Sequence, residues 1–302
     1  MTGIIAATGT KAAVATKASS RTRTRARSGP RRRQGSHWWI HVVLGVGGFV
    51  MAFPFIWQII MALSTNAQVT SPTPVFWPGQ LQWQNFAQVF ERLPFLSQLA
   101  TSVWVTLIRT VVQIILCTFA GYAFARMRFR GRGLILGIVL SILLVPSQVY
   151  LISQYQIVQG LGWLDTLAGI VAPGLFSAFG TFLMRTAFLN MPAELEEAAR
   201  MDGANPFQTF WRIMLPLARP SMSVLAITTV LWSWNELLWP LVVSTRAESM
   251  PLAAGLATLS SDRTVNYPVL MAASLMAMAP VLIMFIVLQR RVIDGLASSG
   301  LK

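Results

Sequence analysis

Residues 196–220 read EEAARMDGANPFQTFWRIMLPLARP, a charged and proline-punctuated stretch between two apolar runs. Strong helix formers begin near Pro192, a residue suited to a first helical turn. Gly203 can adopt the left-handed conformation that commonly ends such a helix. Asn205-Pro206 has the pattern of an N-cap followed by a first-turn proline, which starts a second short helix. The stretch therefore predicts two short helices joined by a tight turn.

The same stretch contains its own end signals. Leu215-Pro216 is expected to stop the second helix, and Pro220 is expected to begin the next apolar run. Ala198 and Ala199 are small enough to let another surface approach closely. We expect a compact, rigid knob. The alternative is an amphipathic hairpin that only tethers two membrane spans.

Lipid is the expected solvent for most of the chain. Of its 302 residues, 54% are hydrophobic and 11% are charged, whereas charged residues make up about a quarter of a soluble domain. Backbone groups in lipid must bond within their own segment, so each apolar run of about 20 residues predicts a transmembrane helix. The six runs are 38–63, 100–124, 133–152, 166–189, 221–244 and 268–289. The predicted fold class is an all-α membrane protein with six transmembrane helices, of which the third is interrupted by Pro146.

Basic residues predict the orientation, because short loops rich in Lys and Arg stay in the cytoplasm. The N-terminal tail, the RMRFRGR loop at 126–132 and the C-terminal Arg290 and Arg291 fall on one side of the six spans. The arginines of the charged stretch fall on that side too. Both termini are therefore expected to be cytoplasmic, with the longer loops 65–99 and 245–267 on the outer side.

The first 33 residues hold nine of the 24 Lys and Arg residues and no Asp or Glu. Such a segment cannot bury enough surface to fold. The chain is therefore expected to divide into a disordered basic cytoplasmic tail, 1–36, and a six-helix membrane domain, 37–302. Because the charge excess is concentrated in the tail, the net charge of +14 indicates attraction to anionic lipid headgroups rather than to nucleic acid.

No metal or disulfide chemistry is indicated. Cys117 is the only cysteine, so no internal disulfide can form. His37 and His41 lie at i, i+4 where the first span begins, but a third ligand is missing. We interpret them as interfacial histidines rather than as a metal site.

The spacing within the charged stretch resembles the EAA signature of ABC importer permeases. Its anchors are Glu197-Ala198-Ala199, three residues, Gly203, nine residues, Ile213, one residue and Leu215-Pro216. Other stretches resemble the carbohydrate-uptake branch of these permeases, specifically its MalG-like subunit: FGTFLMRTAFLNMPAELEEAARMDGA (179–204), WSWNELLWPL (232–241) and QRRVIDGLASSGLK (289–302). The resemblance covers residues 38–302 and leaves out the basic tail.

The resemblance implies the fold of a binding-protein-dependent type I importer permease, with a cytoplasmic coupling loop at 190–220 that docks on an ATPase. The residues that it implies in ATPase coupling are Glu197, Ala198, Ala199, Asp202, Gly203, Ile213, Leu215 and Pro216. The implied partners are a second, MalF-like permease subunit, a dimer of ATP-binding subunits and an extracytoplasmic solute-binding protein. The implied function is ATP-driven import of a sugar or oligosaccharide across the bacterial cytoplasmic (inner) membrane.

The chain is not expected to bind ATP itself. Its three lysines are Lys11, Lys17 and Lys302, and none lies in the pattern G-x-x-x-x-G-K-[ST] that cradles phosphates. We therefore expect a transport subunit rather than an enzyme, with no cofactor of its own. ATP and Mg²⁺ would be used by the partner ATPase.

Polar residues inside the predicted spans mark a candidate solute pathway. Ionisable groups there cost about 2.5–3.5 kcal/mol each on insertion scales, so they generally face the bundle interior or water. Sugars are bound by side-chain hydrogen bonds and flat aromatic faces. The candidates of this chemistry are Asn235, Glu236, Trp232, Gln113 and Arg109, with Trp234 beside them. The alternative is structural: Glu236 and Arg109 would pair or cap backbone groups, and the tryptophans would lie at the membrane interface.

Two other functions stay open. A permease for glycerol-3-phosphate or another non-sugar solute fits the same resemblance, although an anion path should show several cations and only Arg109 lies deep in a span. A membrane adaptor that binds an ATPase and transports nothing belongs to a different class. A continuous polar path through the spans would count against it.

Overall fold

The computed structural model describes residues 38–73, 76–260 and 265–300, with side chains described to Met284 and for Ile286. The expected basic tail, 1–36, and His37 lie outside the described residues. The chain divides into two units, residues 1–51 and 52–302, and each is described by itself. The described part of the first unit is the beginning of one long apolar helix, α1 (Trp38–Ala62).

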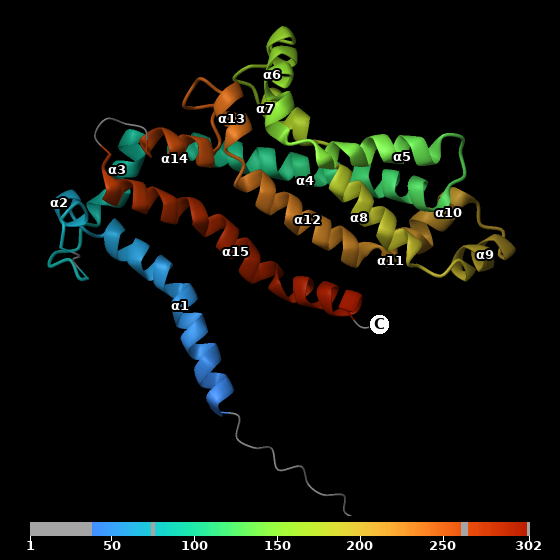
Figure 1. Ribbon diagram of the computed structural model, residues 1–302, viewed down its shortest axis with the longest axis horizontal. Helices are drawn as coiled ribbons and strands as arrows, with labels where there is room; N and C mark the ends of the chain where they lie inside the picture. The colour runs from blue at the N-terminus through green and yellow to red at the C-terminus, as the bar shows by residue number, and fades with distance from the viewer. Residues whose placement is uncertain (1–37, 74–75, 261–264, 301–302) are drawn as a thin grey trace, which may run out of the picture. The chain divides into compact units, whose positions relative to one another are not determined.

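Every regular element in the described part of the chain is helical (Figure 1), which confirms the all-α class. After α1 the α-helices are α2 (Asn66–Val69), α3 (Gln84–Arg92), α4 (Phe95–Arg126), α5 (Arg132–Ser141), α6 (Leu151–Gly160), α7 (Leu167–Val171), α8 (Ala178–Leu189), α9 (Glu194–Met201), α10 (Pro206–Thr209), α11 (Leu215–Leu217), α12 (Arg219–Trp234), α13 (Leu238–Val243), α14 (Leu252–Ser260) and α15 (Tyr267–Gly300). Three short 3₁₀ segments and one π-helical turn complete them: η1 (Ile142–Leu144), η2 (Ser147–Tyr150), η3 (Ala172–Gly174) and the π turn η4 (Phe210–Met214).

Three described helices are each long and apolar enough to cross a membrane: α1, α4 and the part of α15 from Tyr267 to Met284. Three further candidate spans are pairs of helices bent at a short break. If each bent pair counts as one span, the described residues hold six, which is the number predicted. The first expected span, 38–63, matches α1 closely, and the second, 100–124, extends at both ends to the 32 residues of α4.

The third expected helix, 133–152, is broken in the structure. Its segments Arg132–Leu144 and Ser147–Gly160 are bent by 99°. Pro146 has no N–H to continue the helical hydrogen bonds, and Val145 before it is extended, with φ −99° and ψ 119°. The predicted interruption at Pro146 is confirmed: the proline ends the first segment, and a second one begins in a new direction.

The fourth and fifth expected helices, 166–189 and 221–244, are also interrupted. The fourth bends by 43° between Leu167–Gly174 and Ala178–Leu189. In the fifth, α12 ends at Trp234 and α13 begins at Leu238. Pro240 explains this break, because in a continuous helix its ring would meet the carbonyl of Glu236, four residues earlier. Glu236 therefore lies in a break rather than on a helix.

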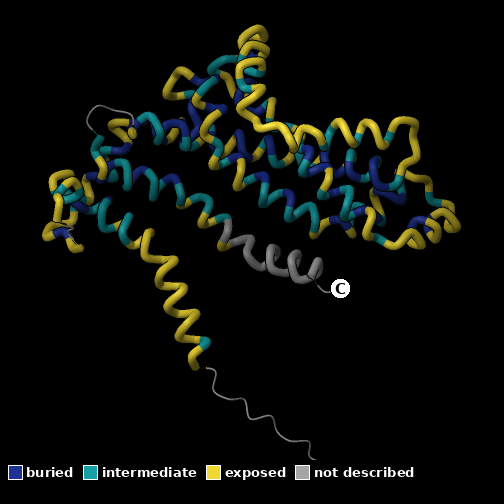
Figure 2. The backbone as a smooth tube through the Cα atoms, in the orientation of Figure 1, coloured by how far each residue is buried: buried dark blue, intermediate teal, exposed yellow. Residues whose placement is uncertain are grey.

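Helix α4 is the axis of the second unit. It packs along α8 and α12, and the three lie side by side in Figure 1. The buried residues on α4 and α8 form one of three hydrophobic clusters with the π turn and α12 (Figure 2). A second cluster joins α4 to α6, α7 and α13, and a third joins its first residue, Phe95, to α3, α14 and α15. Each cluster thus contains at least one residue of α4.

Loops 65–99 and 245–267, expected on the outer side, contain helices of their own. Asn85 on α3 donates to the carbonyls of Ala62 and Ser64 at 2.8 and 3.0 Å, which ties α3 to the end of α1. Asp165 accepts hydrogen bonds from the Thr245 hydroxyl at 2.6 Å and from the backbone N–H groups of Thr245 and Arg246. These bonds, led by that of the Thr245 hydroxyl, lower the pKa of Asp165 to about 2. The carboxylate therefore stays charged at neutral pH and joins the loop before α7 to the loop after α13.

Gly121 sets the distance between α4 and α8. A Cβ at this position would lie 2.6 Å from the Cβ of Met184 and 2.8 Å from the backbone N of Arg185, and these neighbours cannot rotate away. Gly121→Ala is therefore expected to destabilise the protein by about 1–3 kcal/mol, as overpacking does, measured as a lower midpoint of thermal unfolding in detergent. The matched control is Gly137→Ala on α5, where nothing lies within 4 Å of the new methyl group. Equal midpoints for the two variants would contradict this packing.

Candidate functional site

A cavity of about 650 Å³ in the second unit has all five candidate pathway residues in its lining. The full lining is Arg109, Gln113, Gly174, Thr229, Leu231, Trp232, Ser233, Asn235 and Glu236. Its residues come from α4, from the end of η3, and from α12 with the break that follows it. The structure thus brings together candidate residues that the sequence placed on two separate spans. Their contact with a solute stays a prediction.

The cavity lies where helices are broken, and donors from other segments satisfy the exposed carbonyls. Pro173 cannot donate to the carbonyl of Gly169, which instead accepts from the indole N–H of Trp239 at 3.1 Å. The carbonyl of Gly174 accepts from the Gln113 amide at 2.6 Å. Non-helical backbone at membrane depth is tolerated only where such partners, or water, are present.

Arg109 makes the densest set of these contacts. Its Nε donates to the carbonyl of Val171 at 3.4 Å, and its Nη2 donates to the carbonyl of Ile170. Its Nη1 donates to Oε2 of Glu236, which forms an ion pair. Arg109 is only 4% exposed. The sequence analysis gave a structural role as the alternative for Arg109 and Glu236, in which they pair with each other or cap backbone groups. Both kinds of contact are present.

The five candidates differ in how free their polar groups are. Gln113 uses its amide nitrogen on Gly174, and its oxygen accepts from the Thr229 hydroxyl at 3.0 Å. By contrast, the Glu236 side chain is 32% exposed, and Trp232 is 61% exposed. Asn235 is exposed and donates to the carbonyl of Leu231 at 2.8 Å. Glu236, Trp232 and Asn235 are therefore the groups that a solute could contact directly.

A second cavity of about 310 Å³ adjoins the first and shares Gly174 and Glu236 with it. Its polar side chains come from η2 and α6, after the proline break: Ser147, Gln148, Tyr150 and Gln154. The sequence analysis did not single out these residues. The available signal was the run of polar side chains directly after Pro146, within an otherwise apolar span.

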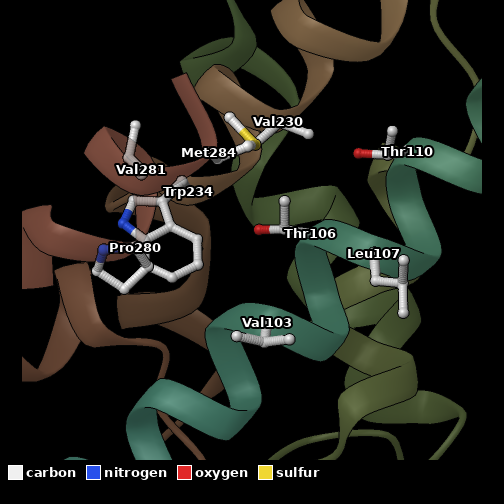
Figure 3. A pocket seen from close by; sticks show the side chains of 9 residues that line it. All are labelled: Val103, Thr106, Leu107, Thr110, Val230, Trp234, Pro280, Val281 and Met284. Carbon is white, nitrogen blue, oxygen red and sulfur yellow. The ribbon is translucent and has the colours of Figure 1, made fainter. Parts of the chain in front are cut away.

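A third cavity, of about 210 Å³, is of another kind (Figure 3). Apolar side chains from α4, α12 and α15 line it, with the hydroxyls of Thr106 and Thr110 as its polar groups. Trp234 lines this cavity, not the largest one, and its indole N–H donates to the carbonyl of Ala277 on α15. Trp234 thus lies outside the lining of the largest described cavity, and the apolar cavity does not suit a solute rich in hydroxyl groups.

The charged stretch forms the predicted helix, turn and helix. Helix α9 ends with Gly203 in the left-handed conformation, φ 81°. The N–H of Gly203 donates to the carbonyl of Arg200 at 3.0 Å and that of Ala204 to the carbonyl of Ala199 at 2.9 Å, which is a Schellman motif. Asn205 then caps α10 in a reciprocal capping box with Gln208. The end signal differs from expectation, because the helix continues past Pro216 as α11, and the chain bends by 68° before α12.

Two contacts hold this segment to the end of α4. The ring of Phe210, in the π turn, is buried with its centroid 4.8 Å from that of Tyr122 and 5.2 Å from that of Phe119. Arg126, the last residue of α4, forms an ion pair with the buried Glu196 of α9 at 3.6 Å. Arg126 also donates to the carbonyl of Phe188 at 2.7 Å, at the end of α8. The segment is thus fixed to two long helices.

The predicted coupling residues do not all reach the surface. Glu197, Ala198, Asp202 and Gly203 are exposed, while Ile213, Leu215 and Pro216 are half-buried. Ala199 is 5% exposed and packs inward, so it cannot be a point of close approach for another surface, as was expected. Two apolar side chains that the sequence analysis did not single out are exposed instead: Met201 at 87% and Phe207 at 67%.

The chain matches the family model described as "Binding-protein-dependent transport system inner membrane component" over residues 113–296. It is 33% identical over 268 residues to the arabinooligosaccharides transport system permease protein AraQ of Halalkalibacterium halodurans, covering 88% of this chain and 96% of that protein. It is 30% identical over 274 residues to the sn-glycerol-3-phosphate transport system permease protein UgpE of Yersinia enterocolitica, covering 88% and 98%.

Two solved structures have the same fold. One is a crystal structure of a bacterial ABC transporter involved in the import of the acidic polysaccharide alginate, with a TM-score of 0.73 and 27% identity over 84% of this chain and 95% of that chain. The other is a bacterial alginate ABC transporter in complex with an alginate pentasaccharide-bound periplasmic protein. Its TM-score is 0.58 at 14% identity, over 85% of this chain and 96% of that chain, which shows the fold alone.

Gly174 allows Arg109 to reach its three partners. A Cβ on Gly174 would lie 2.5 Å from Nε and 2.7 Å from Cζ of Arg109. Gly174→Ala is therefore expected to displace the guanidinium and lower the midpoint of thermal unfolding, whereas Gly160→Ala, with nothing within 4 Å, serves as the control. In the background Arg109→Met the same glycine change should cost less, since the clash is gone. Additive effects of the two substitutions would contradict the contact.

Proposed function

The chain belongs to the family of binding-protein-dependent transport system inner membrane components, and from this membership we propose that, as the permease subunit of an ABC importer, it passes a sugar or oligosaccharide across the cytoplasmic membrane. The observation that carries the proposal is the 650 Å³ cavity, with the exposed ring of Trp232 beside Asn235 and Glu236. An aromatic face with amide and carboxylate groups is the chemistry that binds hydroxyl-rich rings. The hydroxyl and amide groups that line the adjoining cavity add further groups of this kind.

The relatives support the same class of solute. One is a permease for arabinooligosaccharides, and one structural relative imports alginate, an acidic polysaccharide. Another relative is a permease for sn-glycerol-3-phosphate, so a non-sugar solute is the alternative. Membership in the family is therefore consistent with a saccharide as the transported solute, but it does not identify which saccharide.

We further propose that residues 190–220 are the coupling loop for a separate ATPase. The supporting geometry is a rigid helix–turn–helix whose exposed part combines Glu197 and Ala198 with the apolar Met201 and Phe207. Exposed apolar side chains beside charged ones are typical of a docking surface. Because Phe210 and Glu196 hold this segment to α4, a force on its tip would reach the helix that lines the cavity.

The proposed partners follow from this role. They are a dimer of ATP-binding subunits, which use ATP and Mg²⁺, a second, MalF-like permease subunit and an extracytoplasmic solute-binding protein. The chain itself would supply no ATPase site, since none of its lysines lies in a phosphate-binding loop pattern. Both termini and the coupling loop would be cytoplasmic, because the basic residues gather on that side.

The assembly is tested by affinity purification of the tagged chain from native membranes in mild detergent, with every co-purifying chain identified. We expect an ATPase, a second permease and a solute-binding protein. The sugar bound to that last protein then identifies the cargo. An intact preparation with an ATPase but no second permease or binding protein would favour a non-transporting adaptor. The absence of any ATPase would contradict the coupling role of residues 190–220.

Two substitutions test the coupling loop itself. Glu197→Lys reverses an exposed charge at the proposed docking surface, and Gly203→Val places a β-branched residue at φ 81°, a strain of about 1–3 kcal/mol. Each is expected to reduce uptake of the identified solute about tenfold or more, as loss of a docking contact does, at unchanged membrane protein level. The controls are Glu194→Lys on the same helix and Gly203→Asn, because Asn tolerates the left-handed conformation. Normal uptake with both test variants would refute the assignment.

A further inference from the structure

Glu236 presents the only negative charge in the linings of the two adjoining cavities that the structure describes. It lies at their junction, in the break between α12 and α13, and its side chain is 32% exposed. Its Oε2 accepts from Arg109, and no hydrogen bond in the described part of the chain reaches its Oε1. A solute in either cavity therefore meets a carboxylate oxygen that can accept further hydrogen bonds.

Arg109 borders the larger cavity, but its guanidinium is engaged by the protein. All three of its guanidinium nitrogens donate to protein oxygens, two of which are the carbonyls of Ile170 and Val171. Arg109 is 4% exposed and lies directly against the backbone of Gly174, which leaves no room for it to swing out on that side. Among the described residues, no other cationic side chain lines either cavity.

The remaining polar groups of the two linings are uncharged. They are hydroxyl and amide groups and two indoles: Gln113, Ser147, Gln148, Tyr150, Gln154, Thr229, Trp232, Ser233, Asn235 and Trp239. Hydroxyl groups donate well to a carboxylate, and such charge-assisted hydrogen bonds are roughly twice as strong as neutral ones. A phosphate or a uronate carboxylate would instead approach the exposed carboxylate of Glu236, whereas the arginine that neutralises this carboxylate is buried behind it, with each guanidinium nitrogen already donating to the protein.

We propose that Glu236 is a specificity determinant that admits uncharged, hydroxyl-rich solutes and rejects anionic ones. This inference rests on the proposed pathway function of the cavities, and it narrows the substrate class to neutral saccharides. The relatives include carriers of an anionic phosphoester and of an acidic polysaccharide, so family membership does not decide the point. Like-charge juxtaposition is a common way of excluding the wrong ligand.

The test compares a neutral and an anionic probe on the purified complex of this chain with its second permease subunit. Arabinotriose and glycerol-3-phosphate are titrated while the tryptophan fluorescence is followed. Because Trp232 lies in the cavity wall and is 61% exposed, binding there should change its emission. The variant Trp232→Phe should lose this change, which assigns the signal to the cavity rather than to the other tryptophans.

Three variants separate the charge of Glu236 from its structural role. Glu236→Gln keeps the shape and leaves Arg109 unpaired, so the cavity becomes positive. Arg109→Met combined with Glu236→Gln removes both charges, which keeps the test informative if an unpaired buried arginine unfolds the single variant. The matched control is Glu248→Gln, the same change at an exposed glutamate that lines neither cavity.

For the wild type and for Glu248→Gln we expect saturable binding of arabinotriose and none of glycerol-3-phosphate. Glu236→Gln should raise the affinity for glycerol-3-phosphate, relative to arabinotriose, about tenfold or more, and the double variant should lose that gain. Wild-type binding of glycerol-3-phosphate as tight as that of arabinotriose would overturn the inference, as would an unchanged ratio in Glu236→Gln. Either result leaves the importer function standing, whereas binding of neither probe would refute the pathway itself.

Discussion

A backbone carbonyl that loses its helical partner inside a membrane must find another donor, and this constraint organises the centre of the protein. Pro146 and Pro173 lie in two of the bent candidate spans, and Pro240 separates α13 from α12. The freed carbonyls around Pro173 are satisfied by Trp239, Gln113 and Arg109, which come from two other segments. Arg109 in turn needs a counter-charge, and the break made by Pro240 supplies it as Glu236. The polar cavities are the space between these mutually dependent breaks, and broken helices at the membrane midplane are a common way to build a solute site.

The second organising feature is an unbroken helix. Helix α4 contributes Arg109 and Gln113 to the cavity, and it ends at Arg126, which contacts both α8 and the helix–turn–helix of residues 190–220. Glycines keep its packing tight, since a side chain on Gly121 would meet the backbone of α8. Interrupted helices thus supply polar groups and shape, while α4 and α8 connect the cavity to the helix–turn–helix of residues 190–220.

The parts of the fold that depend on local interactions could be predicted from the sequence. The turn at Gly203 and the cap at Asn205 use bonds within five residues, so their residue types were sufficient. Features that depend on contacts between distant segments could not be predicted. The burial of Ala199, the outward position of Met201 and the participation of Gln148 and Gln154 in a cavity follow from packing between helices. The five candidate pathway residues were found because polar groups are rare in lipid-crossing segments. The sequence could not show which of their polar groups are already hydrogen-bonded within the protein and which are free, because that depends on contacts in the folded structure.

The length of the rod between Arg109 and Arg126 has a mechanical consequence. At a rise of 1.5 Å per residue the two arginines are about 26 Å apart along the helix axis. A tilt of about 5° at the Arg126 end therefore displaces the other end by about 2 Å. Hydrogen bonds tolerate far less stretching than this, so the guanidinium of Arg109 cannot follow such a displacement with its present partners. With the carbonyls of Ile170 and Val171 held in place, a tilt of this size would therefore break its hydrogen bonds rather than stretch them.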